Sequence, residues 1–356
     1  MYQRIDRLRK RIEHFELDAF LITSLANIRY LYGFTGSNGI GLITSDLSFF
    51  VTDRRYIQQA KQQVHNAEIL IGKQDLLAEL KKENLLNSGT KLGFEARHLT
   101  VKEFTHLKKT FPEVKLIASE RIVEKIASVK DSEEIANLKK AAVICGEIFD
   151  EIISLLKPGM RELDISAELS YRTKLHGSEK DPFEPMVVSG TRSALPHGAS
   201  SVKRLQLGDL VILDFGAVVN GYAADFTRTI VMGEPSHKQK EMTEVVIEAL
   251  HMSEAATKPG IIGKNLDGVA RDYLKQHGYA QFFMHSLGHG LGLEVHGLPR
   301  IGELSNDPLE VGNVIALEPG VYLPEIGGVR IEDNFVMTKE GIENLNPVRR
   351  ELISVG

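Results

Sequence analysis

The spacing of apolar positions predicts an α/β arrangement for residues 1–125. Apolar side chains recur at helical intervals in residues 4–15 and again in residues 56–64. Three short apolar runs, which are typical of buried strands, lie at residues 17–23, 39–46 and 48–53. Between the first two runs, residues 27–39 (NIRYLYGFTGSNG) are rich in glycine, serine and asparagine, so we expect a long loop there.

A long amphipathic helix is predicted at the start of a second domain. Asp131 is suited to cap its N-terminus, with Glu134 as the reciprocal partner of a capping box. One apolar face follows, formed by Ile135, Leu138, Ala142, Cys145, Ile148, Ile152 and Leu155. The sequence Lys-Pro-Gly at 157–159 ends the helix. We therefore divide the chain into domains at residues 1–125 and 126–356.

The second domain repeats its own pattern. Lys-Pro-Gly recurs at 258–260, and each copy precedes a helical segment that ends in His-Gly. Further along, LQLGDLVILDFG (205–216) matches LEVGNVIALEPG (309–320) at a similar offset. The order of these matches predicts that residues 157–350 hold two copies of a helix-then-hairpin unit, related by a pseudo-twofold axis.

Composition excludes several classes of protein. The 43 Lys and Arg residues nearly balance the 48 Asp and Glu residues, giving a net charge of −5, so we expect no nucleic-acid partner. No apolar run is long enough to span a membrane, and the charged N-terminus is unlike a signal peptide. The single cysteine, Cys145, excludes a disulfide scaffold and a cysteine-rich zinc site. It is predicted to be a core residue, and a cytoplasmic location fits best.

Two aspartates are predicted to converge in the first hairpin, residues 210–232. Asn220-Gly221 is a strong signal for a two-residue turn. That turn places Asp214 opposite Thr227. It also puts Asp225 on the same face as Asp214, with Cα atoms about 7–8 Å apart. Because an apolar run precedes Asp214, a buried carboxylate needs a partner there, either Arg228 or a bound cation.

The second copy adds three further candidates. Glu318 ends an apolar strand, and a turn at residues 324–327 returns Glu332 to its side. His289 lies between glycines, which allow close approach of the backbone, although a histidine in that setting is also often structural. Four carboxylates and one imidazole form an oxygen-rich set suited to two manganese-like ions. Mononuclear zinc is less favoured because no His-Glu-x-x-His helix is present.

These motifs together resemble a known family. The segments DFGAVVNGYAADFTRT, GHGLGLEVH, ALEPGVY and GVRIEDN are similar to those of the pita-bread metallopeptidases, and NIRYLYGFTGSNG resembles the N-terminal domain of the prolidase, aminopeptidase P and creatinase branch. The resemblance implies an α/β N-terminal domain followed by an α+β pita-bread catalytic domain with an internal pseudo-twofold duplication.

The resemblance also implies a metal centre and a reaction. Two divalent ions, manganese or cobalt with zinc as an alternative, would be held by Asp214, Asp225, His289, Glu318 and Glu332. Thr227 would support them. The implied reaction is hydrolysis of an Xaa-Pro bond by a hydroxide between the ions, with Glu318 passing a proton to the leaving nitrogen. A complete ligand set speaks against a creatinase, whose reaction uses no metal.

Further residues are implied to handle the substrate. His197 and His296 match family histidines that orient the substrate and stabilise the oxyanion. Arg300 is a candidate for binding the substrate carboxylate, and His285 and Tyr222 are weaker candidates for substrate binding. Each of the last two could equally serve in packing.

The substrate and the assembly are left with alternatives. Proline dipeptides are slightly favoured, and longer peptides, as for aminopeptidase P, are the alternative. Relatives of this branch usually have His-Glu where this chain has His296-Gly297, and this departure keeps a non-catalytic binding protein open as a second hypothesis. The resemblance implies a homodimer in which residues 32–39 lie near the partner's cleft.

Overall fold

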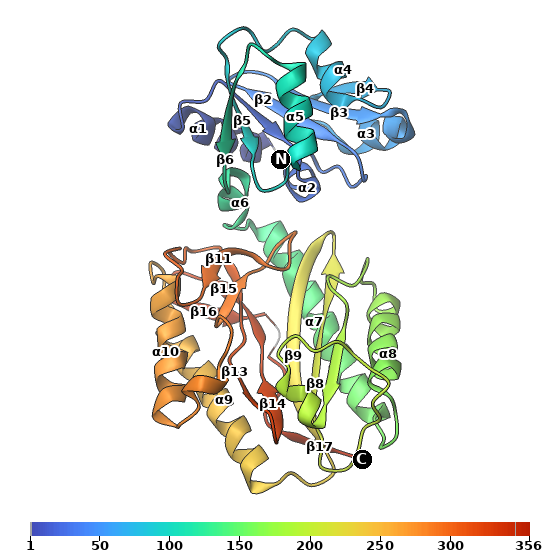
Figure 1. Ribbon diagram of the computed structural model, residues 1–356, viewed down its shortest axis with the longest axis vertical. Helices are drawn as coiled ribbons and strands as arrows, with labels where there is room; N and C mark the ends of the chain where they lie inside the picture. The colour runs from blue at the N-terminus through green and yellow to red at the C-terminus, as the bar shows by residue number, and fades with distance from the viewer. Residues whose placement is uncertain (1, 346) are drawn as a thin grey trace. The chain divides into compact units, whose positions relative to one another are not determined.

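The computed structural model describes residues 2–345 and 347–356. The chain divides into two compact units, Met1–Ala127 and Ser128–Gly356 (Figure 1). Within the described residues, no helix combines the length and apolar character needed to cross a lipid bilayer.

The N-terminal unit is built on one six-stranded mixed sheet. Its strands are ordered β4-β3-β2-β1-β5-β6; the β1–β2 and β2–β3 pairs are antiparallel, and the other pairs are parallel. The strands are β1 (Ala19–Ile22), β2 (Ile40–Thr44), β3 (Ser48–Asp53), β4 (Glu68–Gly72), β5 (Lys91–Glu95) and β6 (Lys115–Ser119). The helices are α1 (Tyr2–His14), α2 (Leu25–Tyr32), the 3-10 turn η1 (Arg54–Tyr56), α3 (Ile57–Gln63), α4 (Leu76–Lys82), α5 (Val101–Thr110) and α6 (Ile122–Ala127).

The structure confirms the first three strands and both flanking helices predicted in this unit, but the long loop is wrong in its first half. Residues 25–32 form α2, in which Ser24 caps the N-terminus by accepting the Asn27 N–H. Gly33 ends the helix in the left-handed region with φ 75°. These two cap signals, and not the overall composition of the segment, decide its local structure.

The C-terminal unit contains two larger sheets and a separate hairpin. One sheet has the order β17-β9-β8-β7, the other has the order β11-β10-β12-β15-β16, and β13 pairs only with β14. The strands are β7 (Met186–Ser189), β8 (Leu210–Val219), β9 (Tyr222–Met232), β10 (Gly288–Gly290), β11 (Gly297–Ile301), β12 (Val314–Leu317), β13 (Gly320–Leu323), β14 (Gly327–Arg330), β15 (Asp333–Met337), β16 (Ile342–Asn344) and β17 (Ile353–Val355). The helices are α7 (Ser132–Leu155), α8 (Glu162–Leu175), α9 (His237–Ala256) and α10 (Gly263–Gln276), with 3-10 turns η2 (Gly190–Ala194) and η3 (Ala280–Phe282).

The predicted repeat is present in the local structure. The helices α8 and α10 follow the two Lys-Pro-Gly sequences and have equal lengths of 14 residues. The glycines that end the matching turns share the left-handed region, since Gly208 has φ 87° and Gly312 has φ 89°. After these turns, β8 and β12 occupy corresponding places in the two halves.

The long helix α7 lies beside β8 and β9 and forms much of the core of this unit (Figure 1). Asp131 and Glu134 form the predicted capping box at its N-terminus. Cys145 is fully buried on the apolar face of α7, as the sequence predicts. Its burial raises the pKa of the thiol, a setting that disfavours the reactive thiolate. This packing supports the strands that carry the acidic residues.

Candidate metal centre

The β8–β9 hairpin places two carboxylates on one face. Its turn, Asn220-Gly221, has positive φ angles of 49° and 86°, as a type I′ turn requires. The register pairs Asp214 with Thr227, which confirms the pairing predicted from the sequence. Gly216, two positions after Asp214 on β8, lies opposite Asp225 on β9. Because alternate residues of a strand share a face, both carboxylates point to the same side of the hairpin.

The second hairpin brings two glutamates to the first. Strands β13 and β14 turn at residues 324–326, where the sequence predicts a turn. The backbone N–H of Glu332 donates to the Thr227 carbonyl at 3.1 Å, and the Thr227 hydroxyl donates to the Glu332 carboxylate at 2.8 Å. Thr227 therefore fixes both the backbone and the side chain of Glu332. Glu318, at the end of β12, faces the same space.

The glycines around His289 allow the strands beside it to approach closely. A Cβ atom on Gly288 would lie 2.0 Å from the carbonyl oxygen of Ala316, and one on Gly290 would lie 1.8 Å from that of Leu298. Any larger residue would push β10 away from its two neighbours in the sheet. The glycines thus hold the His289 backbone between β11 and β12, with its side chain directed at the carboxylates.

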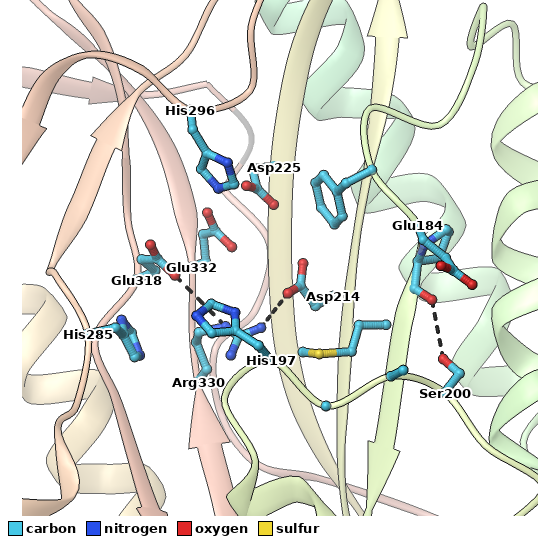
Figure 2. A pocket seen from close by; sticks show the side chains of 15 residues that line it. Glu184, His197, Ser200, Asp214, Asp225, His285, His296, Glu318, Arg330 and Glu332 are labelled. Carbon is cyan, nitrogen blue, oxygen red and sulfur yellow. Dashed lines mark hydrogen bonds and ion pairs between the residues drawn. The ribbon is translucent and has the colours of Figure 1, made fainter.

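Five side chains meet in what we call the acidic cluster, formed by Asp214, Asp225, His289, Glu318 and Glu332. Figure 2 shows its four carboxylates. One oxygen of each of Asp214, Asp225 and Glu332 lies within 4.8 Å of the others. His289 Nε2 lies 3.7 Å from an oxygen of Asp225 and 3.7 Å from an oxygen of Glu318. The structure brings together all five residues that the sequence predicts as metal ligands.

The acidic cluster holds polar atoms that have no partner within the protein. Three of its buried atoms make no hydrogen bond, namely Asp225 Oδ1, His289 Nε2 and Glu332 Oε1. Across residues 2–345 and 347–356, only three other buried side-chain atoms share this condition. Unpaired buried polar atoms are costly, and three converging on one point are the arrangement that a bound cation would satisfy. Carboxylate oxygens and one imidazole suit a divalent ion such as manganese.

Burial and mutual repulsion strongly perturb these groups. Burial, together with the charges of Asp214 and Glu318, raises the pKa of Asp225 well above its usual range. Burial and the charge of Asp225 do the same to Glu332. Burial raises the pKa of Glu318 to about 8, although Arg330 opposes the shift. These carboxylates therefore resist ionising together unless a cation lies among them.

The positive charge of Arg330 partly neutralises the acidic cluster. The Arg330 guanidinium forms a short ion pair with the Asp214 carboxylate, and it donates to the Tyr322 hydroxyl at 3.0 Å. The sequence offered Arg228 as one possible partner of Asp214, and that pairing is wrong. Arg228 pairs with Asp333 at 2.6 Å instead. Position 228 lies opposite Leu213, so its side chain is on the other face of the hairpin from Asp214.

Comparison with known proteins identifies the family. The model of metallopeptidase family M24 matches residues 136–339, and that of the creatinase/prolidase N-terminal domain matches residues 4–129. The chain belongs to the M24 metallopeptidases. The metallopeptidases of this family use divalent metal ions, in keeping with the donor set of the acidic cluster.

Named relatives cover the whole chain. It is 38% identical to an Xaa-Pro dipeptidase of Pyrococcus furiosus, over 99% of this chain and 100% of that protein. The structure of an Xaa-Pro dipeptidase from Bacillus anthracis superposes with a TM-score of 0.95 at 39% identity, covering 99% of both chains. An X-Pro aminopeptidase from Thermotoga maritima superposes at 0.89 with 37% identity, over 97% and 100% of the two chains. The two-domain pita-bread architecture predicted from the sequence is confirmed.

The acidic cluster opens into a cavity of about 290 Å³. Four of its five residues line this cavity, together with Arg330 and three predicted substrate residues, His197, His285 and His296. The His289 and His296 rings meet edge to face at 4.6 Å. His296 Nδ1 or Nε2 also lies within 4.8 Å of ligand atoms of Asp225 and His289, so this histidine borders the cluster directly.

His285 is engaged on both ring nitrogens. Its Nδ1 lies 2.9 Å from the Ser286 carbonyl, which can only accept, so Nδ1 carries the proton. Its Nε2 then accepts from the Tyr322 hydroxyl at 2.7 Å, and that hydroxyl in turn accepts from Arg330. Burial lowers the pKa of His285 to about 3. His285 therefore reaches the cavity as a neutral ring that anchors Tyr322.

The cavity lining does not include Tyr222 or Arg300. Tyr222 is buried, and its hydroxyl donates to Glu134 of α7 at 2.8 Å. Arg300 donates from Nη2 to the carbonyl of His296 at 3.1 Å. Neither side chain lines the cavity, and their predicted contact with substrate stays a prediction.

Arg330 and Tyr322 are the residues that the sequence reasoning missed. Arg330 lies two positions before Glu332, and alternate positions along an extended segment share a face, so its spacing offered a signal. The wall of the cavity opposite the acidic cluster was missed as well; it carries Phe183, Glu184 and Met186.

Proposed function

We propose that this protein hydrolyses Xaa-Pro dipeptides, releasing the residue before proline. The observation that carries the proposal is the acidic cluster, in which buried, unpartnered ligand atoms converge beside a cavity lined by three histidines. Similarity to Xaa-Pro dipeptidases along the full length of the chain gives the substrate class. Proline makes the scissile nitrogen tertiary, so recognition of this bond requires a dedicated site.

The metal centre of this proposal consists of two divalent ions held by the five residues of the acidic cluster. Manganese or cobalt suits the four carboxylates and single imidazole best, and zinc is the alternative. When bound, such ions polarise the scissile carbonyl and supply a nucleophile at neutral pH. The raised pKa values of the carboxylates mean that binding of cations and loss of protons are coupled at this site.

The chain's own residues then divide the remaining work. Glu318, which lines the cavity, can take up a proton released during the reaction and pass it to the leaving proline nitrogen. His197 and His296, which line the cavity, provide hydrogen bonds where negative charge develops on the carbonyl oxygen. Arg330 holds Asp214 in place through their ion pair and places positive charge at that end of the cavity.

The size of the substrate separates two closely related activities. Similarity to two Xaa-Pro dipeptidases along the full length of the chain favours dipeptides. The alternative is cleavage of longer peptides, for which similarity to an X-Pro aminopeptidase provides a specific reason. We extend the proposal to a cytoplasmic homodimer in which residues 32–39 limit the length of the substrate, although Tyr32 itself is buried in its own unit.

The proposal is tested with two substrates and one variant. Protein loaded with manganese or cobalt is assayed on Ala-Pro and on Ala-Pro-Gly, with Glu318→Ala as the control for contaminating peptidases. We expect release of alanine from Ala-Pro and little from Ala-Pro-Gly. Cleavage of Ala-Pro-Gly alone would instead establish the aminopeptidase activity. No cleavage of either peptide by protein with bound metal would overturn the proposal.

A further inference from the structure

The wall of the cavity opposite the acidic cluster combines apolar surface with one acidic side chain. This wall consists of residues 183–186, Phe-Glu-Pro-Met, with Ser200 beneath it. Figure 2 shows Glu184 across the cavity from His285 and Glu318. Strand β7 begins at Met186, which pairs with Asp214 on β8, so the wall is one strand away from the cluster. The wall and the cluster therefore line the same cavity.

The wall is held rigidly in place. Glu184 lies between Phe183 and Pro185, and the proline ring restricts the backbone of the residue before it. The carbonyl of Pro185 accepts hydrogen bonds from the hydroxyls of Ser166 at 2.7 Å and of Ser200 at 3.3 Å. The Ser200 hydroxyl also accepts from the Val187 N–H at 2.8 Å. These contacts fix the backbone on the C-terminal side of Glu184 before any substrate binds.

The Glu184 carboxylate is exposed and uncommitted. No hydrogen bond or ion pair engages it among the residues that the structure describes. In contrast, Asp214 of the same cavity is paired with Arg330. In Figure 2 the Glu184 carboxylate lies on the side of the wall away from the cluster. Only a long side chain that crosses the apolar surface of the wall can reach it.

We propose that Glu184 gives the site a preference for substrates with lysine or arginine before the proline. Both of these side chains carry an apolar stem that ends in a cation. The stem would pack on Phe183 and Met186, and the cation would pair with the Glu184 carboxylate. This inference rests on the proposed Xaa-Pro hydrolysis and names its substrate class.

The experiment compares two dipeptides that differ in charge but are similar in length. We would measure kcat/KM for Lys-Pro and Met-Pro with the metal-loaded wild type, with Glu184→Gln and with Glu340→Gln. Glu340 is an exposed glutamate in the turn between β15 and β16, so its substitution changes the net charge equally away from the cavity. Exposed ion pairs are modest, so we expect Glu184→Gln to lower the ratio of Lys-Pro to Met-Pro about threefold. Glu340→Gln should leave the ratio at its wild-type value.

Three outcomes separate the alternatives. An equal loss for both peptides in Glu184→Gln, with the ratio unchanged, would show that Glu184 acts on a group common to all substrates, such as the α-ammonium, and would overturn the inference. A wild type that cleaves Met-Pro but shows no preference for Lys-Pro would overturn it as well. Failure to cleave either peptide would instead count against the proposed function. Support requires that the Lys-Pro preference also weakens as salt concentration rises.

Discussion

Replacing Thr227 by valine tests whether the contacts behind the acidic cluster set its affinity for metal. Valine has nearly the shape of threonine, so the substitution removes the hydroxyl and leaves the packing of β9 in place. The lost bond is the one from the Thr227 hydroxyl to the Glu332 carboxylate, at 2.8 Å. The same oxygen accepts from Arg330 Nε at 3.2 Å. Thr227→Val therefore loosens both Glu332 and Arg330.

The expected size follows from the chemistry of that bond. A hydrogen bond to a charged group contributes about 1.5–3 kcal/mol, which corresponds to a loss in affinity of roughly tenfold to hundredfold. Glu332 is only 2% exposed, so water cannot readily replace the lost donor. We expect manganese to bind Thr227→Val at least about tenfold more weakly than wild type, as measured by titration calorimetry of metal-free protein.

A second threonine provides the matched control. Thr243, on α9, is equally buried and donates its hydroxyl to the Gln239 carbonyl at 2.9 Å. Thr243→Val should lower the free energy of unfolding slightly and leave the affinity for manganese unchanged. If Thr227→Val bound manganese as tightly as wild type, or if both variants weakened binding equally, the positioning role of Thr227 would be refuted.

Three further predictions concern the same site and its surroundings. The pKa of Glu318 rises from an ordinary value of 4.5 to about 8 on folding, so its contribution to stability is complete below pH 4.5 and is lost as the pH rises through 8. Thermal unfolding of the metal-free protein should show this loss of stability, and manganese should reverse it. Unchanged stability over this pH range would contradict the raised pKa. Arg330→Met should lower the free energy of unfolding of the metal-free protein by about 3 kcal/mol in urea, because it leaves a buried carboxylate unpaired; a loss below about 1 kcal/mol would show that Asp214 is not held by this pair. Cys145 is fully buried with a raised pKa, so a chromogenic thiol reagent should find no reactive thiol in the native protein and one after denaturation, and rapid reaction of the native protein would contradict its core position.

The features that could be predicted from the sequence are those with local signals. Asn220-Gly221 fixes the register of β8 and β9, because few other residue pairs adopt two consecutive positive φ angles. That register in turn fixes the relation of Asp214 to Asp225. The glycines beside His289 and the Lys-Pro-Gly repeats are local in the same sense. Where such signals exist, the pattern along the chain determines which side chains share a face.

The features that could not be predicted depend on contacts between distant segments. The hairpin register directs Arg228 to the face away from Asp214, but only the packing of β14 beside β9 brings Arg330 to that carboxylate. Tyr222 was a candidate for substrate binding because its side chain has a hydroxyl beside the predicted ligands in sequence. Its position in the hairpin directs that hydroxyl toward Glu134 on α7. The wall that carries Glu184 has no motif, because its role arises from the pairing of β7 with β8.

The most direct test of the account measures activity against metal content in one preparation. Protein stripped by a chelator is returned to manganese in steps, and hydrolysis of Ala-Pro is followed together with the bound metal determined by elemental analysis. We predict no hydrolysis by the stripped protein and full hydrolysis when two ions are bound per chain. Hydrolysis that persists in fully stripped protein, or none when two ions are bound, would contradict the account.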